Sequence, residues 1–139
     1  MALILDTGPL FAAHDRRDPD HERSRILLET SRERLVIPAP VANEATHFMT
    51  TRLAPEVLTE FLRDIAAGDY LVQDLLPEDY ARAADICEQY ADARIGFVDA
   101  AVLTVVERLG ERKLATLDHR HFGLLRPRHV DALELLPAL

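Results

Sequence analysis

Ala2-Leu3-Ile4-Leu5-Asp6-Thr7-Gly8-Pro9 is the stretch that decides the fold of this chain. Its apolar run is too short for an ordinary helix and predicts a strand over residues 2–6. The Gly8-Pro9 pair marks the end of this strand and the start of a helix over about 8–15. A strand that leads directly into a helix is the opening unit of an α/β fold.

The same alternation continues along the rest of the sequence. Further strands are expected at 35–37, 70–72 and 114–117, with a fifth at an edge within 130–136. Helices are expected at about 20–33, 40–52, 55–68, 77–91 and 97–109, several of them with proline near the start. We therefore predict a single α/β domain over residues 1–139, with a central parallel sheet of about four to five short strands and helices on both faces.

Composition places the chain among ordinary globular proteins. Hydrophobic residues make up 48% and charged residues 29% of the 139 positions. No apolar run approaches the roughly 20 residues of a membrane span, and the N-terminus lacks the basic segment of a signal peptide. We expect a cytoplasmic protein that makes no membrane contact. A single cysteine, Cys87, excludes an intrachain disulfide and a zinc-finger ligand set.

The formal net charge of −8 argues against tight electrostatic capture of nucleic acid. The positive charge is carried by fifteen arginines and one lysine. Arginine is the better phosphate ligand, because its planar guanidinium bonds two oxygens at once. We expect modest nucleic-acid affinity that depends on metal, since a bound cation would cancel part of the negative charge.

Four acids lie in or beside apolar stretches, where a carboxylate is costly unless it is paired or holds a metal. They are Asp6, Glu44, Asp99 and Asp118. Asp6 and Asp118 follow predicted strands, and Glu44 and Asp99 are expected in the first turns of helices. In parallel α/β sheets the ligand crevice lies outside the carboxyl ends of the strands. Three of the acids therefore converge on local grounds, and Asp99 joins them if its helix begins at that edge.

Acids that converge in this way repel one another, which favours a divalent cation between them. Two carboxylates about 4 Å apart repel by roughly 4 kcal/mol at a surface-like dielectric. Oxygen ligands suit Mg²⁺, with Mn²⁺ as a second possibility, rather than zinc. We assign Asp6 and Asp99 as the principal metal ligands, and Glu44 and Asp118 to a second ion or to the positioning of water. Whether one or two ions act is open.

Each acid has a plainer interpretation when it is taken alone. An aspartate after a strand is often a turn former, and an acid in the first turn of a helix is commonly a cap or a dipole partner. Asp118 could equally be an ordinary loop residue. The joint pattern of the four acids is what favours a catalytic metal site over these alternatives.

A few neighbouring residues are weaker candidates for orienting the carboxylates or the substrate. Thr7 and Thr116 could each hydrogen-bond a carboxylate, although β-propensity alone also explains a threonine near a strand. Asp92 could lie near the site or be a solvated residue, and Arg120 could contact phosphate. The segment 118–122 is expected to be an exposed loop whose histidines are not metal ligands, with Phe122 in the core.

The ordered set of acids and their flanking residues resembles the PIN-domain family, and within it the VapC-type toxin ribonucleases of type II toxin–antitoxin systems. The matching pieces are Ile4-Leu5-Asp6-Thr7, Val41-Ala42-Asn43-Glu44, the stretch from Asp92 through Ile95-Gly96-Phe97-Val98-Asp99 to Ala100, and Leu114-Ala115-Thr116-Leu117-Asp118-His119-Arg120-His121-Phe122. The resemblance covers essentially the whole chain. It implies that the four acids gather at one end of a parallel sheet, bind Mg²⁺ or Mn²⁺, and support cleavage of RNA that leaves a 5′-phosphate and a 3′-hydroxyl. It also implies a cognate antitoxin and a homodimer.

Three alternatives to this function stay open at the level of sequence. The chain could be a PIN-like nuclease that is not a toxin, or a catalytically silent module that binds RNA or protein, for which the loss of an acid would be expected. Leu5-Asp6-Thr7-Gly8 also resembles the catalytic segment of aspartic proteases, which would require a nearly all-β chain. The RNA target is not indicated, so tRNA loops, rRNA hairpins and mRNA are all possible.

Overall fold

A five-stranded sheet in which every neighbouring pair is parallel forms the centre of the computed structural model, which describes residues 1–139. The strands are β1 (Ala2–Leu5), β2 (Arg34–Pro38), β3 (Leu71–Gln73), β4 (Lys113–Ala115) and β5 (Glu134–Leu136). Their order across the sheet is β3-β2-β1-β4-β5. The predicted parallel sheet is therefore confirmed, and the opening strand β1 lies at its middle.

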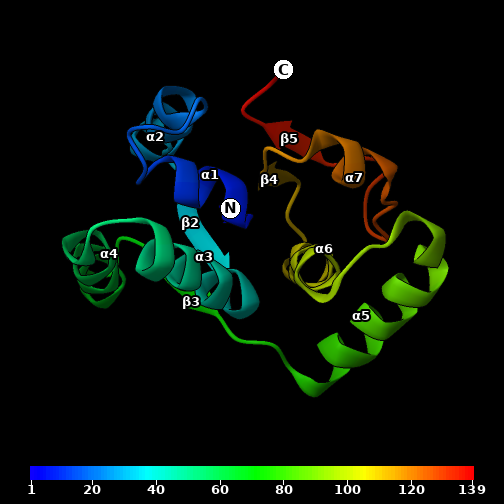
Figure 1. Ribbon diagram of the computed structural model, residues 1–139. Coiled ribbons are helices and arrows are strands. Elements are labelled where there is room, and N and C mark those ends of the chain that lie inside the picture. The colour runs from blue at the N-terminus through cyan, green and yellow to red at the C-terminus, as the bar shows by residue number, and fades with distance from the viewer.

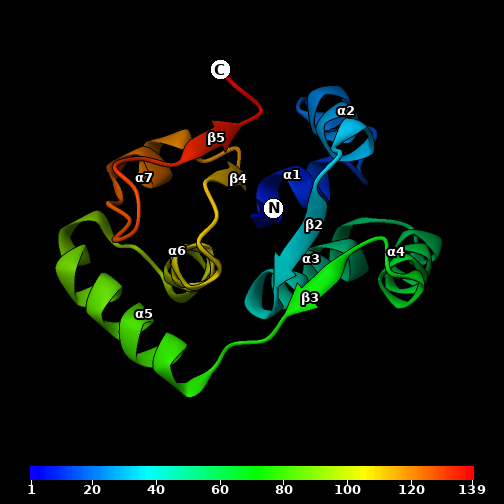
Figure 2. The same cartoon turned by 180° about the vertical axis from the view of Figure 1, so that it is seen from behind.

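Seven helices and one short 3₁₀ turn connect the strands. They are α1 (Thr7–Ala12), α2 (His21–Thr30), α3 (Ala39–Arg52), α4 (Pro55–Ala67), α5 (Pro77–Gln89), η1 (Ala91–Ala93), α6 (Phe97–Leu109) and α7 (His119–Leu124). Right-handed crossovers between parallel strands place α1–α4 on one face of the sheet and α5–α7 on the other. Figures 1 and 2 show these two groups of helices on opposite sides of the molecule. None of the helices is long and apolar enough to cross a membrane.

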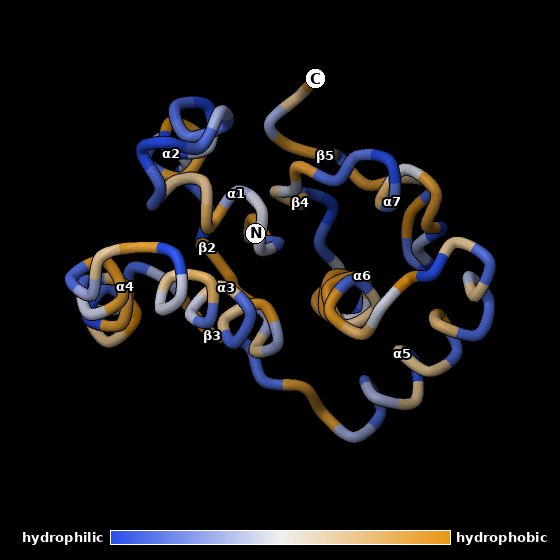
Figure 3. The backbone as a smooth tube through the Cα atoms, viewed as in Figure 1, coloured by the Kyte–Doolittle hydropathy of each residue, from blue (hydrophilic) through white to orange (hydrophobic).

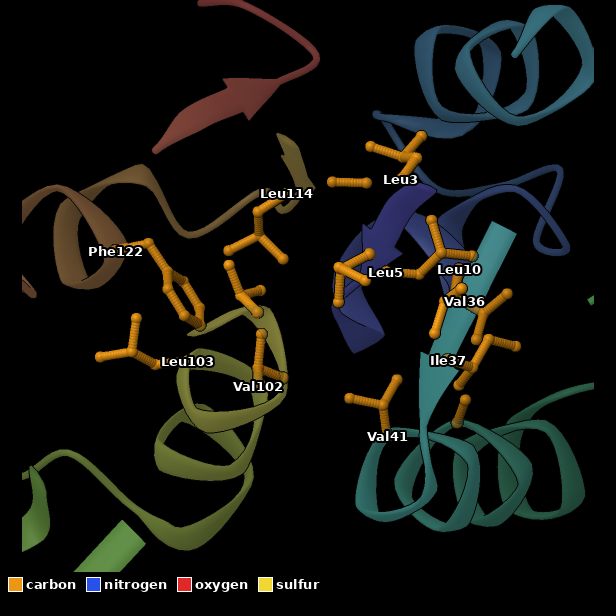
Figure 4. Close-up of a cluster of buried hydrophobic side chains, with 14 of the residues drawn as sticks. Leu3, Leu5, Leu10, Val36, Ile37, Val41, Val102, Leu103, Leu114 and Phe122 are labelled. Atoms are coloured by element: carbon orange, nitrogen blue, oxygen red, sulfur yellow. The ribbon is translucent and has the colours of Figure 1, made fainter. Parts of the chain in front are cut away.

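The core forms where both groups of helices pack on the central strands. All four residues of β1 are buried, as expected for a strand that is covered on both faces. Figure 4 shows side chains from β1, β2 and β4 meeting side chains from the helices, among them Leu103 and Phe122. Helix α6 is buried continuously from Ala100 to Val106, and it is largely orange in Figure 3. Gly110, with φ at +67°, ends this helix.

The strand order creates a crevice beside β1. The connections leave β1 and β4 in opposite directions, so the carboxyl ends of these two neighbours form a topological switch point, which is where parallel sheets bind ligands. Asp6 directly follows β1, and Thr116 directly follows β4. Gly8 lets the start of α1 lie against the β4–α7 connection, because a side chain there would come within 3.3 Å of Leu117 Cβ.

Two sequence-based expectations about local structure are wrong. The segment 118–122 is not an exposed loop, because His119–Leu124 form helix α7, which Asp118 caps and Phe122 anchors in the core. A six-residue helix is too short to show helical periodicity, which is why the sequence did not reveal it. Glu44 does not lie in the first turn of its helix, since α3 already begins at Ala39.

Other predicted boundaries differ by a few residues. Helix α1 ends at Ala12 and α2 at Thr30, and the fifth strand is confined to Glu134–Leu136. Element ends are set by tertiary contacts and fray easily, so differences of this size are expected. The parallel α/β architecture contradicts the aspartic-protease alternative, which requires a chain that is nearly all β.

Candidate functional site

A cleft of about 490 Å³ opens at the carboxyl edge of the sheet. Its lining contains all four acids that the sequence singled out. The full set of lining residues is Asp6, Thr7, Gly8, Phe11, Asp18, Glu44, Phe48, Arg52, Asp99, Leu117 and Asp118. No cysteine, lysine or histidine belongs to this lining, so the chemistry that the cleft can offer is dominated by carboxylates.

Asp6 is the most buried of the four acids, with 7% of its surface exposed. Its backbone N–H donates to the carbonyl of Ala115 at 2.8 Å, which extends the β1–β4 pairing by one residue. The Thr116 hydroxyl donates to Asp6 Oδ2 at 2.8 Å. Burial raises the pKa of Asp6 to about 6; hydrogen bonds from Thr116 and the Thr7 backbone oppose this shift, and the charges of Asp99 and Glu44 add to it.

Asp99 reaches the cleft because α6 begins at this edge of the sheet. It is the third residue of α6, after Phe97 and Val98, and it is half-buried. Burial raises the pKa of Asp99, repulsion from Asp118 and Glu44 adds to the shift, and the nearby His121 opposes it. The sequence had left the position of Asp99 conditional, and the buried packing of α6 resolves it.

Asp118 is both a member of the cleft and the N-cap of α7. Its Oδ1 accepts from the backbone N–H of His121 at 3.1 Å, and its own N–H donates to Thr116 Oγ1 at 3.0 Å. The His121 ring Nδ1 lies 2.6 Å from Asp118 Oδ2, and this contact raises the pKa of His121. Thr116 therefore joins Asp6 and Asp118, since its single hydroxyl contacts both residues.

His121 is a basic neighbour of the acids that was not expected at the site. Ligand atoms of Asp99, Asp118 and His121 all lie within 4.8 Å of one another. The expectation that the histidines of this segment sit on an exposed loop is wrong for His121, which lies on α7 and contacts Asp118. The sequence indicated only that His121 follows Asp118 by three residues. This spacing brings the two side chains into contact when the segment is helical.

Glu44 lines the cleft from α3. Helices α3 and α7 lie on opposite sides of the molecule (Figure 1). It is half-buried, and its charge contributes to the raised pKa of both Asp6 and Asp99. The four carboxylates are thus linked through mutual repulsion, although they come from four separate elements of the chain. No arginine or lysine forms an ion pair with any of them.

The residues present fit a divalent cation. The acids supply oxygen ligands, and their mutual repulsion is the kind that a hard cation relieves. The Thr7 hydroxyl, also in the cleft lining, is buried without any hydrogen-bond partner. A buried polar atom without a partner is rare in proteins, and a hydrated ion in the cleft would give this one a partner.

Two weaker candidates lie outside the cleft. Asp92 is exposed on η1 and forms no ion pair with its neighbour Arg94, and Arg120 is exposed on α7. The structure instead adds residues that the sequence had not connected to the site. Asp18 lines the cleft, and its Oδ1 accepts from the Asp20 N–H at 2.8 Å.

Replacing Asp6 by asparagine is expected to stabilise the metal-free protein by about 2–3 kcal/mol at neutral pH. The folded pKa lies above the unfolded one, so the folded state binds the extra proton and loses stability as pH rises from about 4 to about 6. Urea unfolding in EDTA at several pH values measures this. The advantage of Asp6→Asn should vanish below the ordinary aspartate pKa of 3.8, where the wild-type carboxyl is protonated in both states. A variant that is less stable than wild type at neutral pH would contradict the assigned burial cost.

Comparison with known proteins agrees with this fold. A family model for the PIN domain matches residues 3–125. Ribonuclease VapC26 of Mycobacterium tuberculosis is 34% identical over 125 residues, which cover 90% of this chain and 93% of that protein. Two solved structures share the fold at lower identity. The sarcin–ricin-loop-cleaving toxin VapC20 of Mycobacterium tuberculosis gives a TM-score of 0.75 at 15% identity, covering 81% of this chain and 87% of that one. A toxin–antitoxin complex from Klebsiella pneumoniae gives a TM-score of 0.65 at 16% identity. The match covers 87% of this chain and 90% of that one. The chain belongs to the PIN domain family, and within it to the VapC-type proteins.

Proposed function

We propose that this protein is a Mg²⁺-dependent endoribonuclease and the toxin component of a toxin–antitoxin pair. The observation that carries the proposal is the convergence of Asp6, Glu44, Asp99 and Asp118 in one cleft at the switch point of the sheet. The similarity to a VapC ribonuclease supports RNA as the substrate class. Because all four acids are present, a nuclease is favoured over a silent binding module.

Asp6, Glu44, Asp99 and Asp118 divide into two pairs with different roles. Asp6 and Asp99, which burial makes reluctant to ionise, are the principal metal ligands, and Glu44 and Asp118 hold a second ion or position water. Bound Mg²⁺ supplies neutralisation of the phosphate charge and activation of a water molecule. Thr116 fixes the orientation of the Asp6 carboxylate, and His121 fixes that of Asp118. Attack by water at phosphorus leaves a 5′-phosphate and a 3′-hydroxyl.

Partners and location follow from the same proposal. The toxin–antitoxin complex that shares this fold supports a cognate antitoxin, which would cover the cleft and offer a cation to the acids. We further propose a homodimer that acts in the cytoplasm. Mn²⁺ is the alternative ion, since it accepts the same oxygen ligands.

Incubation of the purified protein with total RNA tests the function. Cleavage is expected in Mg²⁺ and is expected to disappear in excess EDTA, because removal of the cation leaves the acids repelling the phosphate backbone. Sequencing of the new ends should find 5′-phosphates at a small number of positions. In parallel, Mg²⁺ should raise the melting temperature of the wild type but not of Asp6→Asn. Full cleavage in EDTA would overturn the metal-dependent mechanism, and no cleavage in either Mg²⁺ or Mn²⁺ would favour the binding-module alternative.

A further inference from the structure

One face of α3 runs from the acids to an arginine along the wall of the same cleft. Glu44, Phe48 and Arg52 are spaced four residues apart, so they lie on one side of the helix, and all three line the cleft. The Arg52 guanidinium carbon lies 4.1 Å from the centre of the Phe48 ring. Phe11 packs edge-on against Phe48, with 6.0 Å between ring centres, and lies 5.9 Å from the guanidinium.

Arg52 is exposed and forms no ion pair, although the chain carries a net charge of −8. Contact with an aromatic face holds a guanidinium in place and leaves its N–H edge available for a ligand. An arginine held by a carboxylate would have this edge occupied. The pair Phe48–Arg52 therefore presents positive charge to an occupant of the cleft.

Arg52 also lines a second groove, whose other residues come from the α1–α2 connection and from the junction of α3 and α4. The residues of this groove are His14, Asp15, Arg16, Arg17, Arg52, Leu53, Ala54 and Val57. With His14 neutral, the three arginines and the one aspartate of this groove sum to a net charge of +2. The side chains of Arg16 and Arg17 form no ion pair either. Arg52 therefore belongs both to the acidic cleft and to a groove whose ionised groups carry a positive net charge.

We propose that Arg52, held in place by Phe48, binds a backbone phosphate of the RNA strand a few nucleotides away from the bond that is cut. This inference rests on the proposed nuclease function. The rise of α3 from Glu44 to Arg52 is about 12 Å, which equals about three to four stacked nucleotides at about 3.4 Å each. Arg52 is therefore a substrate-binding residue and Phe48 a positioning residue, and neither contacts the reacting phosphate. Arg16 and Arg17 continue the phosphate path.

Binding measurements on the Asp99→Asn variant test this assignment without cleavage of the probe. The probe is a fluorescein-labelled single-stranded RNA of mixed sequence, and its anisotropy is followed in Mg²⁺ at several salt concentrations. Addition of Arg52→Gln should weaken binding about tenfold and reduce the slope of log K against log salt by about 0.7. Arg112→Gln is the matched control, since Arg112 is also exposed and unpaired but precedes β4, at the opposite edge of the sheet. It should leave the slope unchanged.

Two further variants separate charge from positioning. Arg52→Lys should keep the salt slope, because the charge is retained, while losing part of the affinity of the planar guanidinium. Phe48→Leu should weaken binding by loss of the aromatic face, and Phe48→Tyr should restore it. In cleavage assays on the otherwise wild-type protein, Arg52→Gln should raise KM about tenfold and leave kcat within about twofold.

The outcomes distinguish this proposal from the function on which it rests. If the wild type cleaves RNA but Arg52→Gln leaves KM and the salt slope unchanged, the phosphate assignment is overturned and the nuclease function stands. If Arg52→Gln weakens RNA binding while the wild type never cleaves, the phosphate path stands and the nuclease function fails. If Arg52→Gln changes only the binding of a polyglutamate peptide, the groove belongs to a protein partner and the RNA proposal is overturned.

Discussion

Replacing Asp99 by asparagine is expected to lower the rate of RNA cleavage about a thousandfold or more while leaving the fold intact. The substitution removes the charge of a metal ligand and almost no volume, so about 4 kcal/mol of transition-state stabilisation is lost without a cavity. Burial and repulsion raise the pKa of Asp99, which means that its charged form is unfavourable in the metal-free protein. Loss of this charge should therefore not destabilise the fold. Initial rates of cleavage in Mg²⁺ measure the effect.

The control for this variant is Asp131→Asn, which makes the same chemical change at an exposed residue outside the cleft. It should cleave as the wild type does. Circular dichroism and thermal melting establish that both variants are folded. Wild-type rates from folded Asp99→Asn would show that Asp99 is not a ligand of the catalytic ion.

Replacing Glu107 by glutamine is expected to lower the free energy of unfolding by about 2–4 kcal/mol. Glu107 accepts two hydrogen bonds from Arg82, at 2.8 and 3.0 Å, and one from the backbone N–H of Arg128 at 2.8 Å. The side chains of the Arg82–Glu107 pair are only 13% and 9% exposed. Glutamine would leave the Arg82 guanidinium partly buried without its counter-charge, and the α5–α6 contact that this pair holds would loosen.

The pH dependence of this effect has a definite sign. Burial alone would raise the pKa of Glu107, but the hydrogen bonds from Arg82 and Arg128 outweigh it and lower the pKa below its ordinary value. A lowered folded pKa gives stability that is present above the ordinary pKa of 4.5 and is lost as pH falls through the lowered value. The difference between wild type and Glu107→Gln in urea unfolding should therefore shrink in acid.

An exposed ion pair supplies the comparison. Glu29, which is 61% exposed, pairs with Arg25 on the surface of α2. Glu29→Gln should leave the free energy of unfolding unchanged within experimental error, because solvent screens such a pair. An equal loss of stability in both variants would show that the burial of the Arg82–Glu107 pair is not what stabilises the α5–α6 contact.

Local sequence was a good guide to the sheet and to two of the acids. The apolar run before Asp6 and the run before Thr116 each define a strand, and a parallel sheet necessarily brings the carboxyl ends of its strands to one edge. Glu44 was placed at the correct edge but in the wrong turn of α3. The strand that precedes α3 fixes the edge, whereas the helix begins at Ala39, five residues before Glu44, which puts Glu44 in its second turn.

The contacts made by His121, Phe48 and Arg52 could not be predicted in the same way. His121 meets Asp118 because a six-residue helix forms there, and that helix depends on the burial of Phe122. Phe48 and Arg52 follow Glu44 at helical spacing, but spacing alone does not reveal that this side of α3 faces the cleft. Only the packing of Phe11 from α1 against Phe48 does so.

The sequence by itself determined the alternation of strands and helices, the identity of the four acids and the edge of the sheet at which three of them lie. These features depend on interactions between near neighbours, namely hydrophobic pattern and turn chemistry, which the order of residues specifies directly. The tertiary structure alone decided that Asp99 enters the cleft, that Thr116 joins Asp6 to Asp118, and that Arg52 stands at the far end of the same wall. Each of these depends on contacts between residues far apart in the chain, and such contacts exist only once the burial of α6 and the crossing of α1 over α3 have fixed the distances between them.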